Sequence, residues 1–211
     1  MTLPSKLACV LVLLAVAGCV PVNSSDMEMA RAEARSEFDR AAGRPPTIRT
    51  LHAMATLLAA KGDDEQARIV LMHILARDPQ YSPAYNDLAA LHQREGHEAE
   101  ARAALTAGIQ ANPNDAVLHN NMGLCHLQAE EYDLALERFN HAVEIDPLND
   151  KYQGNRALTV GLMGDDEEAM KIYSTFLPMS EARANVRLIA QIRERKATTE
   201  FGGTEPTDGV E

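Results

Sequence analysis

The sequence repeats with a period of about 34 residues, and this period limits the folds that the chain can adopt. Pro79, Pro113 and Pro147 are spaced at this interval. The same interval relates four further series, namely Ala55, Ala89, Gly123 and Ala157; Gly62, Gly96 and Gly164, with Glu130 as the exception; Ala67, Ala101, Ala135 and Ala169; and Leu71, Leu105, Phe139 and Tyr173. Coincident series at one period indicate stacked copies of a supersecondary unit in place of a single globular core.

Each copy reads as two helices joined by a tight turn. The chain has only 4% aromatic residues and no tryptophan, and it is rich in alanine, a composition that favours packed helices over sheets. Small residues midway along the first helix and early in the second allow the two backbones to approach closely. The glycines end the first helix in a left-handed conformation, and the prolines end the second. This pattern predicts four helical hairpins over residues 48–81, 82–115, 116–149 and 150–183.

The third copy carries the most specific residue pattern. It reads AVLHNNMGLC at residues 116–125 and EYDLA at 131–135, followed by Phe139, Ala142 and Pro147. This string resembles the tetratricopeptide repeat (TPR) family, and the resemblance covers residues 48–183. It implies an all-α fold, a right-handed TPR superhelix (α-solenoid). The fourth copy departs from the family, because Arg156 stands at a usually apolar position and Glu181 replaces the proline. Pro178 is expected to truncate its second helix.

Segments on both sides of the repeats are predicted to be partly helical. Within residues 19–47, a polar tether precedes a helix that runs through Ala41, and the paired prolines of residues 43–46 break it. Residues 180–196 read as one amphipathic helix, of which 184–196 lie beyond the fourth copy. Solenoids need a terminal cap with a polar outer face, and this helix suits that role. Residues 197–211 are expected to form a disordered tail.

Residues 1–18 read as a secretory signal peptide. Lys6 supplies a positive flank, and residues 7–17 form an apolar stretch too short to span a bilayer as a helix. Residues 16–19, VAGC, resemble the bacterial lipobox, which implies cleavage before Cys19 and attachment of lipid to its thiol. Val20 replaces the aspartate that commonly retains such lipoproteins at the inner membrane, which favours an outer-membrane anchor on the periplasmic side. An ordinary cleaved signal and an uncleaved anchor are the alternatives.

The sequence shows no catalytic constellation. The seven histidines form no HExxH pattern, and no glycine-rich phosphate loop is present. His119 and His126 share a helix face but are interpreted as helix-surface residues, and Cys125 as a small buried hydrophobe. The acidic runs at 62–65 and 164–167 lack the ligand spacing of a calcium loop. The net charge of −11 would repel phosphate backbones. We therefore expect no enzyme activity, metal, cofactor, small-molecule substrate or nucleic-acid partner.

Function is therefore expected to lie in a protein-binding surface. In the TPR family, fixed positions of the first helices line a concave groove. The resemblance assigns these positions to Arg49, His52 and Thr56; Asn86, Ala90, Gln93 and Arg94; Asn120, Leu124, Leu127 and Gln128; and Lys151, Gly154, Leu158 and Gly161. One hypothesis is that Asn86 and Asn120 bond the backbone of an incoming peptide. In that hypothesis Leu124, Leu127 and Leu158 pack its side chains. The alternative is that the amides only bridge neighbouring repeats.

A lipobox followed by a short TPR array resembles the tight-adherence (Flp) pilus assembly lipoproteins, the TadD family. The likeness extends to NRAL at residues 155–158, LMG at 162–164, Leu177-Pro178 and EARANV at 181–186. It implies a non-enzymatic, lipid-anchored scaffold with a pilotin-like role, which escorts or stabilises an outer-membrane secretin. The alternative is an outer-membrane adaptor that docks or regulates cell-wall enzymes.

Overall fold

The computed structural model describes residues 45–201 of the chain. The chain divides into two units, Met1–Thr47 and Ile48–Glu211, and only the second is described over most of its length. The predicted signal peptide, the lipid attachment site Cys19, the predicted helix through Ala41 and the end of the expected tail, 202–211, lie outside the described residues.

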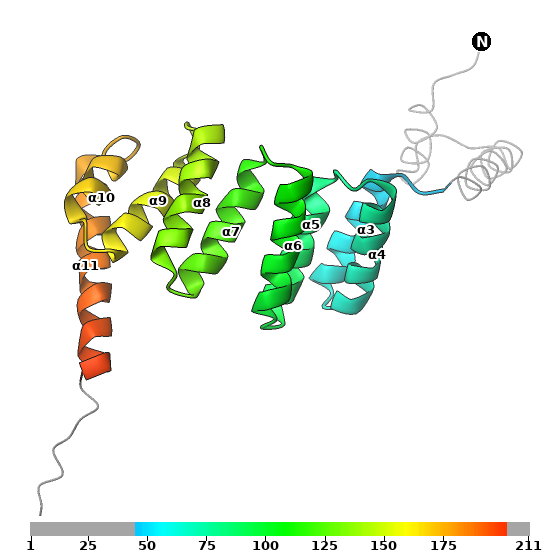
Figure 1. Ribbon diagram of the computed structural model, residues 1–211, viewed down its shortest axis with the longest axis horizontal. Coiled ribbons are helices and arrows are strands. Elements are labelled where there is room, and N and C mark those ends of the chain that lie inside the picture. Colours follow the sequence, from blue (N-terminus) through cyan, green and yellow to red (C-terminus); the bar gives the residue numbers. More distant parts are fainter. Residues whose placement is uncertain (1–44, 202–211) are drawn as a thin grey trace, which may run out of the picture. The chain divides into compact units, whose positions relative to one another are not determined.

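Helices make up nearly all of the described residues, and no strand occurs among them. Their bounds are α3 Ile48–Ala60, α4 Asp64–Arg77, α5 Ser82–Arg94, α6 Glu98–Ala111, α7 Ala116–Gln128, α8 Tyr132–Ile145, α9 Asp150–Leu162, α10 Asp166–Tyr173 and α11 Met179–Phe201. Consecutive helices pack as antiparallel hairpins, which stand side by side from α3–α4 to α9–α10, and α11 packs against the last hairpin (Figure 1). The predicted all-α solenoid of helical hairpins is confirmed for this part of the chain.

The first helices of successive hairpins form a layer of their own. Each contacts its equivalent in the next repeat, since α3 contacts α5, α5 contacts α7 and α7 contacts α9. The second helices of the hairpins show no comparable contacts with one another among the described residues. The first helices therefore present one shared face, on which side chains of neighbouring repeats can meet.

The repeated residues form the interior of the solenoid. All four alanines at the start of the second helices, Ala67, Ala101, Ala135 and Ala169, are completely buried. Burying a small side chain here lets the two helices of a hairpin lie close together, and the larger residues one turn later fill the space between hairpins. Leu71, Leu105 and Phe139 at those positions are at most 1% exposed. The core thus continues from repeat to repeat, as in other solenoids.

The turns between paired helices require a left-handed residue. Gly62, Gly96 and Gly164 take φ values of 83°, 76° and 104°. Glu130, the exception in the glycine series, adopts the same conformation with φ 60°. Any residue with a Cβ is strained there by about 1 kcal/mol. Lys196 on α11 partly offsets this strain, because its Nζ donates to Glu130 Oε1 at 2.6 Å.

We expect Glu130→Gly to be more stable than Glu130→Ala by about 1 kcal/mol. Both variants lose the pair with Lys196, so their difference isolates the backbone strain. Urea denaturation of the two proteins measures it. Equal stabilities would show that the turn tolerates a left-handed non-glycine residue without cost.

The fourth hairpin and the capping helix differ from the regular repeats. Helix α10 ends at Tyr173, and a turn leads to Pro178 before α11 begins. Ala182 and Ile189 of α11 are buried against the last hairpin. Arg193 donates to both carboxylate oxygens of Asp166, at 2.8 and 3.0 Å, and also to a backbone carbonyl of α9. Helix α11 continues through Phe201, so residues 197–201, expected in the disordered tail, are helical instead. The hydroxyls of Thr198 and Thr199 donate to the backbone carbonyls of Arg195 and Lys196, as threonine does within a helix, so these two residues fit the extension.

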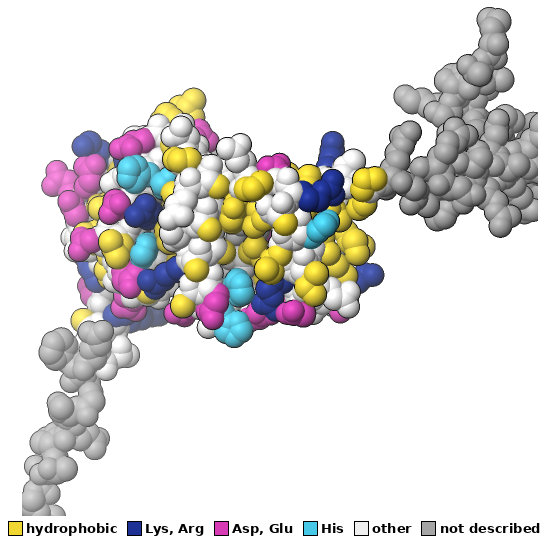
Figure 2. Space-filling view, turned by 45° about the vertical axis from the view of Figure 1, so that its right-hand side comes forward, with side chains coloured by type: hydrophobic (Ala, Val, Ile, Leu, Met, Phe, Trp, Pro, Cys, Tyr) yellow, Lys and Arg dark blue, Asp and Glu magenta, His cyan; other side chains and the backbone are white. Residues whose placement is uncertain are grey.

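Hydrophobic side chains are exposed at the α3–α4 end of the described unit. Met54, Leu57, Ile69 and Met72 are each more than half exposed, and Figure 2 shows hydrophobic side chains gathered at this end. Apolar clusters of this kind are typical of contact surfaces.

Within residues 45–201, no helix combines the length and the apolar character needed to cross a bilayer.

Candidate functional site

A continuous chain of polar side chains crosses the face formed by the first helices. We call it the polar ladder, and its members in order are His52, Asp87, Asn86, Asn121, Asn120 and Asn155. His52 Nε2 lies 2.8 Å from Asp87 Oδ2, and Asn86 Nδ2 donates to Asp87 Oδ1 at 3.3 Å. Asn121 Nδ2 donates to Asn86 Oδ1. Asn120 Nδ2 donates to Asn121 Oδ1 at 3.1 Å and Asn155 Nδ2 to Asn120 Oδ1 at 2.7 Å. The ladder therefore links α3, α5, α7 and α9.

The ladder accounts for the two asparagines predicted to bind a peptide. Both ends of the Asn120 amide have partners, and the residue is only 1% exposed. Asn86 likewise donates and accepts within the ladder. The sequence left two interpretations of these asparagines, binding of a peptide backbone and bridging between neighbouring repeats. The observed bonds are those expected for bridging. Because the groups are satisfied internally, they hold the first helices in register.

Three ladder residues, Asp87, Asn121 and Asn155, were not predicted from the sequence. Each inter-repeat step joins residues 35 apart, from His52 to Asp87, Asn86 to Asn121 and Asn120 to Asn155. This offset is one residue longer than the repeat period, and it joins side chains on the first helices of two successive hairpins. A search for polar pairs at this offset would have found all three.

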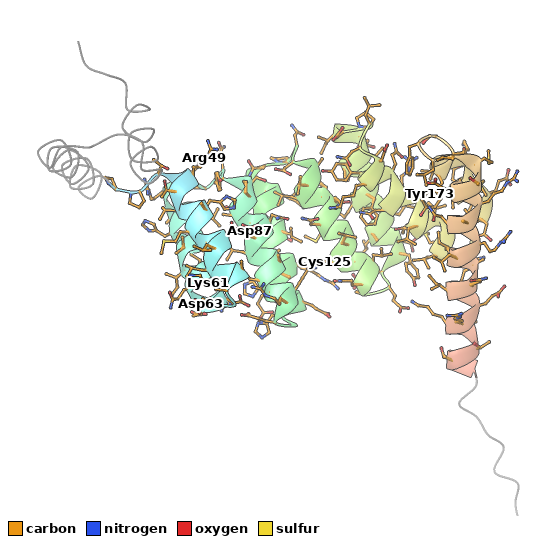
Figure 3. All side chains as sticks on the ribbon, turned by 180° about the vertical axis from the view of Figure 1, so that it is seen from behind. Arg49, Lys61, Asp63, Asp87, Cys125 and Tyr173 are labelled. Carbon is orange, nitrogen blue, oxygen red and sulfur yellow. The ribbon has the colours of Figure 1, made fainter. Side chains whose placement is uncertain are left out.

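His52 is held from both ring nitrogens. Tyr81 Oη lies 3.1 Å from Nδ1, and the two rings meet edge to face with centroids 5.3 Å apart. A carboxylate can only accept, so Nε2 of His52 donates to Asp87, while the tyrosine hydroxyl faces the other ring nitrogen. His52 thus terminates the polar ladder as a fixed, half-buried group. Figure 3 shows Asp87 on α5.

A small hollow lies beside the ladder between the first two hairpins. Its volume is about 150 Å³, and Ala55, Thr56, Ala59, Leu71, Asp87, Ala90, Leu91 and Arg94 line it. Three of these, Thr56, Ala90 and Arg94, were predicted groove residues. Arg94 is fixed at the rim, because its Nε donates to Asp64 Oδ2 at 3.0 Å. The hollow combines an apolar lining with one acid and one base, and it has room for a small apolar side chain.

The predicted groove positions of the third hairpin adjoin those of the second. Gln93 Nε2 donates to Gln128 Oε1 at 3.4 Å and lies 3.2 Å from the sulfur of Cys125. Cys125, which Figure 3 labels, is buried, and this burial raises the pKa of its thiol. The cysteine therefore belongs to the core, with Ala89, Leu105 and Leu118 in the same cluster. Leu124 and Leu127 are half-buried beside these amides.

The remaining predicted positions lie toward the two ends. Arg49 and Lys151 are exposed and Gly154 is half-buried. Leu158 packs against the core cluster that includes α11. Gly161 is buried, and a Cβ added there would lie 3.0 Å from Ile189 on the capping helix. The open part of the predicted groove is therefore its stretch across α3, α5 and α7.

Comparisons with known proteins agree with this architecture. Tetratricopeptide repeat models match residues 82–115 and 116–149. A tetratricopeptide repeat protein from Parabacteroides merdae superposes with a TM-score of 0.59 at 18% identity, over 87% of this chain and 75% of that one. Pseudomonas aeruginosa pilF superposes with a TM-score of 0.56 at 19% identity, over 75% of this chain and 77% of that one.

Curated relatives are similar over part of their length. The mouse protein O-mannosyl-transferase TMTC1 is 28% identical over 107 residues, which are 48% of this chain. The chain spans 11% of that relative, and 17% and 18% of two others that it matches. The similarity therefore covers a small part of each of those proteins. Residues 82–149 therefore match the tetratricopeptide repeat, and the solved neighbours share the fold of the described helices.

Proposed function

We propose that the chain is a non-enzymatic scaffold, lipid-anchored through Cys19 at the periplasmic side of the outer membrane, which binds a segment of a partner protein on its first helices. The observation that carries the binding role is the hollow between α3, α4 and α5, beside the polar ladder. TPR repeats are generally protein-interaction modules, although some enzymes contain TPR regions. The anchor rests on the lipobox-like residues 16–19.

The hollow suits a short apolar side chain of an incoming segment. Its floor consists of Ala55, Leu71 and Leu91, while Asp87 and Arg94 stand at its rim. Both rim charges are already paired within the protein, Asp87 with His52 and Arg94 with Asp64. The bound segment would therefore contribute an apolar anchor, and its backbone polar groups would meet the rim.

For the partner, we propose a component of a tight-adherence pilus apparatus, with an outer-membrane secretin as the first candidate. The motifs at residues 155–158 and 181–186, which resemble those of the TadD family, support this assignment. In this role the lipid would hold the scaffold at the membrane where the secretin assembles. The scaffold would act in a pilotin-like manner, without chemical turnover.

The anchor and the partner can be tested together in cells. Intact cells expressing the protein at native level are crosslinked, the outer membrane is solubilised, and co-purifying proteins are identified. A secretin recovered with the wild type but not with Cys19→Ser supports both proposals. Recovery of cell-wall enzymes in its place would move the function to envelope maintenance.

We expect Ala90→Trp to reduce recovery of the partner about tenfold or more, because the indole fills the hollow. Ala90 is exposed, so the substitution leaves the core intact. Ala107→Trp, at an exposed position of α6 away from the first helices, is the matched control. Undiminished recovery with Ala90→Trp would place the binding surface elsewhere.

A further inference from the structure

Two histidines and a glutamate meet at the turn between α5 and α6. His92 lies in the last turn of α5, Glu95 follows the end of that helix, and His97 precedes α6. One ligand atom from each lies within 4.8 Å of the others. His97 Nδ1 is 3.2 Å from Glu95 Oε2, and the two imidazole centroids are 6.2 Å apart. The left-handed turn at Gly96 brings them together.

The equivalent turn of the next repeat shows what is unusual here. His126 occupies the position that His92 has in the second repeat, and Glu131 occupies that of His97. His126 Nδ1 is bonded to Glu131 at 2.6 Å. In the second repeat a histidine stands where that carboxylate would be, and Nδ1 of His92 is buried without a hydrogen-bond partner. With the imidazole proton on the other ring nitrogen, Nδ1 offers its lone pair to a ligand.

We propose that His92, Glu95 and His97 form a binding site for a divalent transition-metal ion of the Zn²⁺ class. Two imidazole nitrogens and one carboxylate are a ligand set that zinc uses in proteins, with the fourth position open to water. Ligands of a tetrahedral ion with bonds of about 2.0–2.1 Å lie roughly 3.3 Å apart. The 3.2 Å separation of His97 Nδ1 and Glu95 Oε2 matches this spacing. Hard cations such as Mg²⁺ prefer an all-oxygen shell and suit the site poorly.

Arg68 competes with the metal for the carboxylate. Its Nη1 donates to Glu95 Oε2 at 3.0 Å, and its other terminal nitrogen donates to Glu65. The bond from Arg68 lowers the pKa of Glu95, so the carboxylate is ionised and ready to coordinate. Metal binding displaces Arg68 from Glu95, and Arg68 keeps Glu65 as its partner. The affinity of the site for the metal ion therefore depends on Arg68, which is not itself a ligand.

A bound ion would cross-link the end of α5 to the start of α6. The adjacent residues Gln93 and Arg94 lie on the predicted groove. Metal binding would thus stiffen the turn that supports this part of the protein-binding surface.

The test is a calorimetric titration of the full chain with ZnCl₂, purified in detergent without a histidine tag. We expect the wild type to bind Zn²⁺ saturably and the double variant His92→Ala/His97→Ala to bind at least tenfold more weakly. His126→Ala, the equivalent substitution one repeat along, is the matched control and should bind as the wild type does. Absence of saturable binding, or equal affinity of the double variant and the wild type, would overturn the proposal.

A second variant tests the competition independently of any loss of folding. Arg68→Gln frees Glu95, and we expect it to tighten Zn²⁺ binding several-fold. Arg102→Gln removes the corresponding arginine of the next repeat, which is paired with Glu131, and should leave the affinity unchanged. Weakened or unaltered binding by Arg68→Gln would show that Glu95 is not a ligand.

Discussion

Replacing Phe139 by Ala is expected to lower the free energy of unfolding by about 3–5 kcal/mol. The ring is completely buried, and it lies directly against Gly123 of the paired helix. A Cβ built on Gly123 would stand 2.6 Å from Phe139 Cε1, closer than any real contact. Removing the ring therefore leaves a cavity between α7 and α8, beside a glycine that has no side chain to fill it. Urea denaturation monitored by circular dichroism measures the loss.

The same contact predicts a compensating pair of substitutions. In the first two repeats the corresponding pairs are Ala55 with Leu71 and Ala89 with Leu105, and each pair lies in one core cluster. The third repeat combines a smaller residue with a larger one. Gly123→Ala alone overpacks the site at a cost of about 1–3 kcal/mol, partly offset by about 1 kcal/mol of helix propensity.

Adding Phe139→Leu to Gly123→Ala should recover stability, because the double variant recreates the alanine–leucine pair of the other repeats. We expect a favourable coupling of about 1–2 kcal/mol in the double-mutant cycle. Additive effects of the two substitutions would show that α7 and α8 move apart freely, in conflict with close packing at this point.

The helical architecture could be predicted from the sequence because the residues that recur with the repeat period are those that pack between helices. Only a small residue fits where the two helices of a hairpin touch, as at Ala101. Because such a residue recurs once per repeat, the sequence alone locates the contact between the paired helices. Gly96 marks its turn for the same reason. Glu130 breaks the glycine series, yet its backbone adopts the same left-handed conformation. The fold thus requires the left-handed turn itself. Glycine is the usual residue there, but its absence does not mean that the turn is absent.

The polar surface was less predictable from the sequence. Positions assigned from the TPR family located Asn86 and Asn120 on the correct helices, but not the partners that their amides bond. Those partners depend on how one hairpin is rotated relative to the next. Because of this rotation, the bonded residues are 35 apart and not one repeat period apart. The cluster of His92, Glu95 and His97 was missed for a related reason. Its residues converge only through the turn at Gly96, and their spacing matches no common ligand pattern.

The polar ladder has a physical role that does not depend on any partner. Hydrophobic contacts between hairpins are non-directional and permit small rotations of one repeat against the next. Hydrogen bonds between these amides, of which Asn120 is buried and the others are half-buried, favour one arrangement, because any other leaves polar groups unsatisfied. The ladder therefore fixes the relative positions of α3, α5, α7 and α9 and, with them, the shape of the hollow at Ala90.

Asn120→Leu should reveal the strength of this constraint, with an expected loss of about 2–3 kcal/mol in the free energy of unfolding. Leucine keeps the branched shape of asparagine and is somewhat larger, so no cavity opens while Asn155 Nδ2 and Asn121 Oδ1 lose their bonds to residue 120. Asn140→Leu, at an exposed position of α8, is the matched control and should change stability by less than about 0.5 kcal/mol.

The double variant Asn120→Leu/Asn155→Leu separates the lost bond from the cost of the unpaired amide. If the polar ladder is a cooperative constraint, removing Asn155 as well should cost less than the sum of the two single losses, since the Asn155 amide is then no longer left facing leucine. A double variant that loses the full sum would mean that water satisfies each amide separately. In that case the hydrophobic core alone would set the positions of the hairpins.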